Sequence, residues 1–196
     1  KYKGGYRSWW GFETLPEVNE ENPSYVEFIT GEGGVIDTWL RRGAAGFRLD
    51  VADELPDDFI EKIRAAVKRV SPEKFLLGEV WEDATTKYGF GQRRTYLLGK
   101  GLDSVMNYPF KNAVLDFVKG KPAEQAMGEI LSICEHYPAP AMDTALNFLS
   151  THDTERALTV IADEPANGRG REWQSGRCVT GEAYEEGMLR LRMAYA

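Results

Sequence analysis

Three short, strand-like runs of the sequence each lead into an acidic residue. Asp50 follows "GFRL", Glu79 follows "FLLG", and Asp153 follows "NFLSTH". Carboxyl groups serve as nucleophile and as general acid or base in bond cleavage, provided that they lie within reach of the same bond. The three acids are therefore the candidate catalytic residues of this chain.

A cation stands among these acids. Arg48 precedes Asp50 by two residues, in a segment otherwise made of small or apolar residues. Residues two apart on a strand face the same side, so the guanidinium is expected beside the Asp50 carboxylate, keeping it ionised and oriented. Taken alone, this pair could be a structural ion pair. Glu79 alone could be a surface carboxylate, and His152 with Asp153 a helix cap. The repetition at successive strand ends favours catalysis.

The strand-like runs recur at the spacing of βα units. They cover residues 46–51, 75–80, 104–108 and 145–150, so their starts lie 29, 29 and 41 residues apart. Consecutive parallel strands joined by helical crossovers form either an open doubly wound sheet or a barrel. In a barrel, polar residues at the carboxyl ends of the strands meet at one mouth. The position of the three acids therefore predicts an α/β chain of the (β/α)8 TIM-barrel type.

Apolar residues at helical spacing lie between the strand-like runs. Two stripes are expected to face a sheet and a third marks one face of a C-terminal helix: Phe59, Ile63, Ala66 and Val70; Ala123, Met127, Ile130 and Cys134; and Tyr184, Met188, Leu191 and Tyr195. Short helices are expected at 23–30 and 35–42, and the aperiodic stretch 163–181 is expected to be a long surface loop. Residues 1–45 then form a segment with short helices leading into the barrel, and residues 46–196 a partial barrel that carries the carboxylates.

Composition narrows the class of partner. The 196 residues carry a formal net charge of −7, which argues against nucleic acid as the main partner and favours a neutral ligand. No apolar stretch approaches the roughly 18 residues of a membrane span, so no membrane association is expected. Two cysteines, Cys134 and Cys178, are too few for a disulfide framework or a metal cluster, and the sequence leaves open whether they form one disulfide. The first residues, "KYKGGYRSWW", contain no initiator Met and no signal peptide, as in the middle of a longer chain.

The segments around the three acids resemble a known family. "GFRLDVADE", "FLLGEVWED" and "LNFLSTHDTERALT" are similar to three of the four sequence signatures of the α-amylase family, glycoside hydrolase family 13, and most similar to its neopullulanase, cyclomaltodextrinase and maltogenic amylase group. "SWWGFETLPEVNEENP" and "LDSVMNYPF" resemble connecting segments of that group. The family's first signature, at its third strand, and an eighth strand are not found. The resemblance implies that the chain spans the fourth to seventh βα units, about half of the barrel.

The resemblance implies a role for each residue of the matching motifs. Asp50 would be the nucleophile, Glu79 the general acid/base, and Asp153 the residue that binds the hydroxyls of the cleaved sugar and stabilises the transition state. Arg48 and His152 match the family's remaining contacts in the same site. A retaining glycosidase needs one carboxylate ionised as nucleophile and another protonated as acid. No cofactor is required and no metal is expected in the site, while a structural calcium could belong to the full-length protein.

Five further residues are expected to line the substrate site: Trp81, Glu54, Asp53, Asn107 and Tyr108. Trp81 is expected on the acceptor side, where an indole can stack on a glucose ring, with a place in the core as the alternative. Glu54 matches the Glu that the neopullulanase group usually has at this position, and that group acts on short maltodextrins, cyclodextrins or pullulan. Asp53 departs from the Asn usual in that group. Asn107 and Tyr108 either line the pocket or simply end the third strand.

The function implied is retaining hydrolysis of α-1,4-linked glucans of the maltodextrin, cyclodextrin, pullulan or starch type. The alternatives are an α-glucan transglycosylase of the same family and a non-catalytic carbohydrate-binding or partner protein of this fold, although the intact trio of acids speaks against the latter. Half a barrel leaves open strand edges. We therefore expect the isolated chain to be inactive, and its edges to be covered by the missing half or by a second copy in a homodimer. By analogy with the subgroup, the protein is expected to be cytoplasmic.

Overall fold

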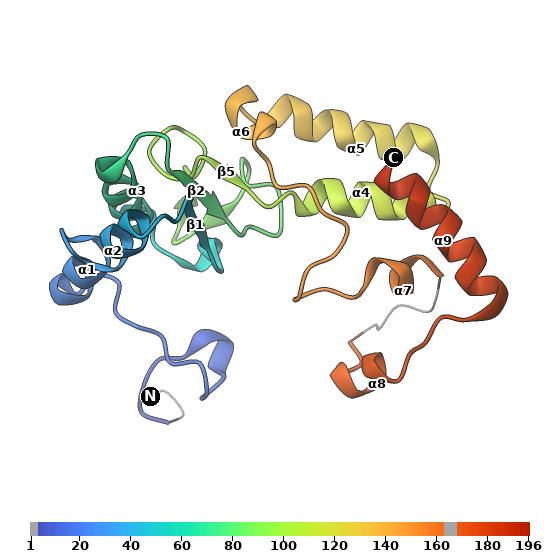
Figure 1. Cartoon of the computed structure of the whole chain (residues 1–196), viewed down its shortest axis with the longest axis horizontal. Coiled ribbons are helices and arrows are strands. Elements are labelled where there is room, and N and C mark those ends of the chain that lie inside the picture. The colour runs from blue at the N-terminus through green and yellow to red at the C-terminus, as the bar shows by residue number, and fades with distance from the viewer. Residues whose placement is uncertain (1–3, 163–167) are drawn as a thin grey trace.

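The computed structural model describes residues 4–162 and 168–196. Its strands are β1 (Gly46–Leu49), β2 (Phe75–Gly78), β3 (Tyr88–Gly89), β4 (Gln92–Arg93) and β5 (Ser104–Val105). Its helices are α1 (Pro23–Thr30), α2 (Val35–Arg41), α3 (Asp57–Val70), α4 (Tyr108–Val118), α5 (Ala123–His136), α6 (Ala139–Asp143), α7 (Ala157–Ala162), α8 (Arg171–Ser175) and α9 (Gly181–Tyr195), with short 3-10 helices η1 (Trp9–Gly11) and η2 (Ala52–Glu54). In Figure 1, α1, α2 and α3 gather beside β1, β2 and β5, while α4, α5, α7 and α9 group on the other side of the view.

A parallel sheet in the order β1-β2-β5 forms the centre of the chain. Leu49 of β1 pairs with Gly78 of β2, which pairs in turn with Val105 of β5. A further parallel bridge joins Met106 to Leu146. The four runs that the sequence predicts as strands are therefore neighbours in parallel, in the order of the chain, as successive βα units require.

The strands are shorter than the sequence predicts. The four predicted runs reduce to segments of four, four and two residues and one bridged residue. β1 ends early because Asp50 enters a turn and Val51 adopts a left-handed conformation. β5 ends early because Asn107 caps α4, so Tyr108 begins a helix instead of ending a strand.

Gly46 allows β1 and β2 to approach each other closely. A Cβ atom at this position would lie 1.9 Å from the backbone carbonyl oxygen of Phe75, a distance that real Cβ atoms do not show. The glycine that opens the "GFRLD" run is therefore needed for strand pairing, not for chemistry.

Helix α3 presents the predicted stripe to the sheet. Phe59, Ile63 and Ala66 are buried, and Val70 packs partly buried against the same cluster, which includes Leu76 of β2. Helices α1 and α2 form close to their predicted positions and both pack against α3. This part of the fold is as the sequence predicts.

Helix α5 forms where predicted but buries a different face. Its buried residues are Ala126 and Ile133, whereas Met127 and Cys134 of the predicted stripe are exposed. The expectation that this stripe faces a sheet is wrong, because α5 lies along α4 (Figure 1) and the helix-helix contact selects another set of residues.

Helix α9 forms where predicted, and its covered face includes only part of its apolar stripe. Tyr184 and Tyr195 are exposed, whereas Gly187 is buried and Leu191 packs against the apolar cluster of α4 and α7. A Cβ atom at Gly187 would lie 2.5 Å from the Cβ of Ala162 in α7. The absence of a side chain at this glycine therefore lets the two helices meet closely and decides which face of α9 is covered.

The predicted surface loop at 163–181 contains the short helix α8, while 163–167 lies outside the described residues. Cys178 in this stretch is exposed, and both it and Cys134 are free, so the disulfide left open by the sequence does not form in the described structure. Within the two described ranges, none of the helices is both long and apolar enough to traverse a lipid bilayer.

Replacing Gly46 by Ala is expected to destabilise the chain, because the added methyl group must push β1 and β2 apart. Overpacking of this kind costs about 1–3 kcal/mol of free energy of unfolding, which urea denaturation measures. Gly128 is the matched control, since it lies in α5 with open space at its Cβ position. Gly128→Ala should raise the free energy of unfolding by about 0.5–1 kcal/mol. Equal effects of the two substitutions would contradict the close approach of the strands.

Candidate active site

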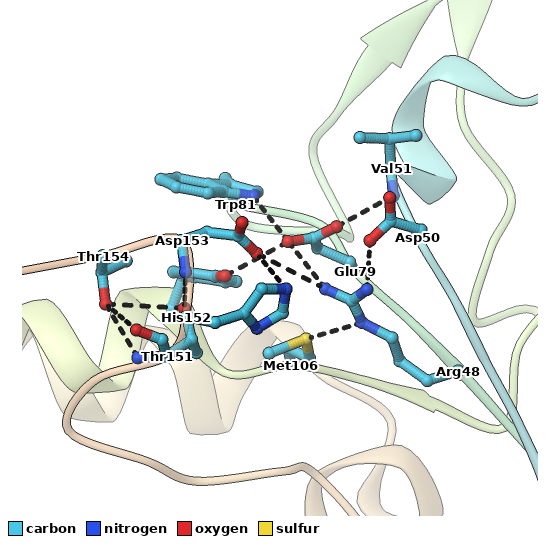
Figure 2. A network of polar contacts seen from close by, with 11 residues as sticks. Arg48, Asp50, Val51, Glu79, Trp81, Met106, Thr151, His152, Asp153 and Thr154 are labelled. Atoms are coloured by element: carbon cyan, nitrogen blue, oxygen red, sulfur yellow. Dashed lines mark hydrogen bonds and ion pairs between the residues drawn. The ribbon is translucent and has the colours of Figure 1, made fainter. Parts of the chain in front are cut away.

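The carboxyl ends of the strands bring the three predicted acids around one point, as Figure 2 shows. Asp50 follows β1 and Glu79 follows β2, directly after the paired residues Leu49 and Gly78. The backbone keeps the two acids level, because the N–H of Glu79 donates to the carbonyl of Leu49 at 2.9 Å. Asp153 reaches the same point from the segment between α6 and α7. Three separate segments thus converge as the sequence predicts.

Arg48 lies at the centre of this cluster. Its Nη1 atom contacts Asp50, and its Nη2 atom lies 2.9 Å from Glu79 Oε1. The same nitrogen lies 4.0 Å from Asp153 Oδ2, and Nε donates to Met106 Sδ at 3.5 Å. A guanidinium holds its donors in a rigid plane, so one cation can serve acceptors on several sides. The contact with Asp50 is predicted from the sequence, whereas the contact with Glu79 is not.

Glu79 is buried, and donors surround its carboxylate. Oε2 accepts a hydrogen bond from the backbone N–H of Val51 at 2.9 Å. Oε1 accepts from the indole N–H of Trp81 at 3.1 Å and from the hydroxyl of Tyr108 at 3.3 Å. Only 2% of the residue is exposed. With Arg48, these groups hold the carboxylate in one orientation.

The N–H of Val51 reaches Glu79 through an unusual backbone conformation. Val51 has a φ of 41°, in the left-handed region that a β-branched residue rarely adopts. Such strain costs about 1–3 kcal/mol and persists only where the surrounding structure imposes it, which is often at functional sites. The turn after β1 is therefore a second indication, besides the acids, that this end of the sheet has a function.

Asp50, Asp153 and His152 are more accessible than Glu79. The side chain of Asp50 is 71% exposed and that of Asp153 is 39% exposed. His152 Nε2 lies 3.1 Å from Asp153 Oδ2, and its side chain is largely exposed to solvent. The sequence predicts a buried segment at 46–51, but β1 is an edge strand with no described segment paired to its outer side. Asp50, at the end of this strand, is therefore exposed to solvent.

Two of the residues predicted to line the substrate site, Trp81 and Tyr108, reach the acid cluster. Their rings stack with centroids 4.5 Å apart and an interplanar angle of 13°. One face of the half-exposed Trp81 is therefore covered by Tyr108, which is itself buried. Asn107 is also buried, and its side chain caps α4 by accepting from the backbone N–H of Phe110 at 3.3 Å.

Glu54 and Asp53 lie in η2, just after Asp50. Glu54 accepts a hydrogen bond from the indole N–H of Trp10 at 3.3 Å and lines a cavity of about 830 Å³, whose described lining contains none of the three central acids. Asp53 forms an ion pair with Lys87 at 3.3 Å. Burial raises the pKa of the Asp53 carboxyl, and the Lys87 ammonium opposes that effect.

Arg94, which sequence reasoning missed, fixes the segment that contains these residues. Its Nε atom lies 2.8 Å from Asp57 Oδ1, and its Nη1 donates to the carbonyl of Asp53 at 2.7 Å. Nη2 donates to the carbonyl of Leu55, and the guanidinium lies 4.4 Å above the ring of Tyr96. The polar run "FGQRRTYLL" carries no periodic signal that could identify this arginine as buried.

Three carboxylates surround one guanidinium in this cluster. Throughout 4–162 and 168–196, no group of three or more His, Cys, Asp or Glu side chains is placed to hold a metal ion. The positive charge nearest to the three acids is the guanidinium of Arg48.

Comparison with known proteins gives the family of the chain. The family model described as "Alpha amylase, catalytic domain" matches residues 4–175. An amylopullulanase of Thermoanaerobacter thermohydrosulfuricus is 36% identical over 198 residues, which cover 86% of this chain and 13% of the relative. A cyclomaltodextrinase of a Bacillus species is 37% identical over 155 residues, which cover 76% of this chain and 25% of the relative.

Solved structures show the same relationship. The ligand-free cyclic α-maltosyl-(1→6)-maltose hydrolase from Arthrobacter globiformis is similar with a TM-score of 0.71 and 29% identity, over 81% of this chain and 34% of the other. A cyclomaltodextrinase is similar with a TM-score of 0.69 and 36% identity, over 80% of this chain and 25% of the other. The fold is therefore part of a TIM-type (β/α)8 barrel, as the sequence predicts.

This chain belongs to the alpha-amylase family, which confirms the resemblance drawn from its three motifs. It spans 13% of the length of the amylopullulanase and 25% of the length of the cyclomaltodextrinase.

Replacing Arg94 by Met should lower the free energy of unfolding by about 3 kcal/mol, because it removes the cation from a buried ion pair and leaves Asp57 without its partner. The control is Arg190→Met, which breaks an exposed pair with Glu186 in α9 and should cost only about 0.3–0.5 kcal/mol. Urea denaturation of the chain measures both. A loss below about 1 kcal/mol for Arg94→Met would contradict its role as an anchor.

Proposed function

We propose that this chain carries the catalytic carboxylates of a retaining α-glucan hydrolase. The observation that carries the proposal is the meeting of Asp50, Glu79 and Asp153, from three separate segments, around the guanidinium of Arg48. The family, and relatives named amylopullulanase and cyclomaltodextrinase, support an α-glucan as the substrate.

Asp50 and Glu79 divide the reaction into two displacements. In the first, Asp50 attacks the anomeric carbon, the glycosidic C–O bond breaks, and the leaving oxygen takes a proton from Glu79. In the second, a water molecule gives a proton to Glu79 while its oxygen attacks the anomeric carbon and releases Asp50. The exposed Asp50 is accessible to a sugar, and the buried Glu79 is held to one orientation, as these roles require.

Asp153 acts on the sugar ring. Its carboxylate lies near both Arg48 and His152, so it can accept hydrogen bonds from sugar hydroxyls that strengthen as the ring flattens toward the oxocarbenium-like state. An interaction that is stronger in the transition state than in the ground state accelerates the chemical step.

The contacts of Glu79 suit the base of the second displacement. The backbone N–H of Val51 and the indole N–H of Trp81 donate to this carboxylate, and the Arg48 guanidinium forms an ion pair with it, so all three contacts suit a carboxylate. As the acid of the first displacement, Glu79 must carry a proton on one of these oxygens. The Arg48 guanidinium contacts Asp50 and Glu79 and lies near Asp153, so it is a cation shared by the three acids.

The substrates we propose are α-1,4-linked maltodextrins, cyclodextrins, pullulan or starch. The free face of Trp81 offers a surface for a glucose ring, while Glu54 and Asp53 follow Asp50 in the turn after β1. Transglycosylation is the second candidate, since an acceptor sugar can replace water in the second displacement. Product analysis with added glucose separates the two, because a hydrolase gives the same products with and without it.

In the longer protein that contains this chain, Glu79→Gln should lower kcat on maltotriose by about 10²–10⁴-fold, because an amide cannot serve as acid or base. Asp50→Asn and Asp153→Asn should also abolish most of the turnover. The control is Asp116→Asn on α4, where the half-exposed carboxylate pairs with Lys121 away from the cluster. Proton NMR of the first product should show the α-anomer. Full activity of Glu79→Gln, or inversion of the anomer, would contradict the proposal.

The chain of 196 residues alone is expected to show negligible turnover on the same substrates. β1 has an open edge, and Asp50 at its end is largely exposed to solvent, so the site lacks the enclosure that strengthens its electrostatic contacts. We propose that further barrel units, or a second copy of the chain, cover this edge. Turnover by the isolated chain equal to that of the longer protein would contradict this, and light scattering shows whether the chain is a dimer.

A further inference from the structure

The acid/base proposed above has two aromatic partners that also contact each other. Trp81 and Tyr108 both donate to the same oxygen of Glu79, and their rings are stacked (Figure 2 shows the contact of Trp81). We propose that Tyr108 is a positioning residue that orients the carboxyl of Glu79, directly through its hydroxyl and indirectly through Trp81. This inference rests on the proposed role of Glu79.

Tyr108 is too deeply buried to bind a sugar. Only 1% of the residue is exposed, and its hydroxyl lies 3.3 Å from Glu79 Oε1. The sequence predicts Tyr108 as a residue that lines the substrate pocket or ends a strand. Its ring lies against Trp81, of which 44% is exposed, and this arrangement indicates a different role. Trp81 faces outward, and Tyr108 supports it from within.

The Tyr108 ring is held on two sides. Trp81 stacks on one face at 4.5 Å, and Phe148 meets the ring edge-on at 4.8 Å with an interplanar angle of 80°. Both geometries are those that aromatic pairs prefer. The backbone of the neighbouring Asn107 is fixed as well, because its N–H donates to the carbonyl of Leu146 at 2.9 Å. A side chain restrained in this way can fix the orientation of its hydrogen-bond partner.

The hydroxyl of Tyr108 keeps its proton in this environment. Burial raises the pKa of the Tyr108 phenol, a hydrogen bond with Thr151 lowers it, and the charge of Glu79 raises it further. The other charged groups near Tyr108 are Asp153, from the segment before α7, and Lys111, whose Nζ lies 5.7 Å from the ring. The phenol therefore keeps its proton and can donate it in a hydrogen bond to Glu79.

The effect of losing this hydroxyl differs from that of disturbing the core. Without the donor, the orientation of the Glu79 carboxyl is less restricted. Cleavage that needs a proton on the leaving group should then slow. A glycoside with an activated leaving group needs no such proton, so it should be cleaved almost normally.

The experiment introduces Tyr108→Phe into the longer protein that contains this chain. It measures kcat/KM on maltotriose and on 2,4-dinitrophenyl α-maltoside. We expect a decrease of about tenfold on maltotriose with KM nearly unchanged, and a decrease of less than about twofold on the aryl glycoside. Tyr96→Phe is the matched control, because Tyr96 is equally buried and its hydroxyl has no hydrogen-bond partner among the described residues. It should leave kcat/KM on both substrates unchanged.

Equal losses on the two substrates would overturn the inference, because a merely structural role slows both reactions alike. Trp81→Phe provides a second variant, since it keeps a ring on Tyr108 but removes the indole donor. This variant should also lose more kcat/KM on maltotriose than on the aryl glycoside. Equal losses would count against an indirect effect of Tyr108 on Glu79 through Trp81. Failure of the parent protein to cleave any α-glucan would instead reject the proposed function, which keeps the two failures distinct.

Discussion

Three carboxylates that lie together repel one another, and a cation between them reduces that repulsion. Asp50, Glu79 and Asp153 converge on the guanidinium of Arg48, and without it their mutual repulsion and the burial of Glu79 would oppose the fold. Lysine could not replace this arginine, because a single ammonium cannot reach acceptors in several directions of one plane. The charge of Arg48 therefore stabilises this end of the sheet and serves the chemistry proposed there.

The geometry that delivers these groups is set by the backbone. Parallel pairing places Leu49 opposite Gly78, so that the acids that follow them are level, and Gly46 allows the two strands to lie close enough for that register. The turn after β1 adds the strained residue Val51, whose N–H completes the contacts of Glu79. The strands thus provide alignment, and the turns at their ends provide the donors.

Sequence reasoning succeeded where an element packs against its immediate neighbours along the chain. The stripe from Phe59 to Val70 is buried as predicted because α3 covers the sheet beside which it lies. It failed for α5, because the partner of that helix is another helix. It does not identify the covered face of α9, because the glycine at 187 decides a contact that hydrophobic spacing does not record. Helical period alone predicts that a face is apolar, but it cannot say which neighbour covers it.

The acids themselves were accessible to sequence reasoning because each ends an apolar run, and three motifs in order are specific. The supports of Glu79 were not. One is a backbone N–H whose direction depends on the φ of Val51, and another is a tyrosine 29 residues farther along the chain. Buried Arg94 was missed for the same reason, since only the folded chain shows which of two adjacent arginines meets Asp57. The sequence shows which residues can act as acids, whereas the groups that hold those acids in place are seen only in the tertiary structure.

The contacts of Glu79 come from several successive units: the turn after β1, the loop after β2, and the first turn of α4. A chimaera that exchanged only the unit containing this glutamate between two relatives would move the acid away from the groups adapted to it. The stretch from β1 to the start of α4 is therefore a natural block for inheritance and for recombination, and crossover points placed outside it should preserve the local architecture better than those within it.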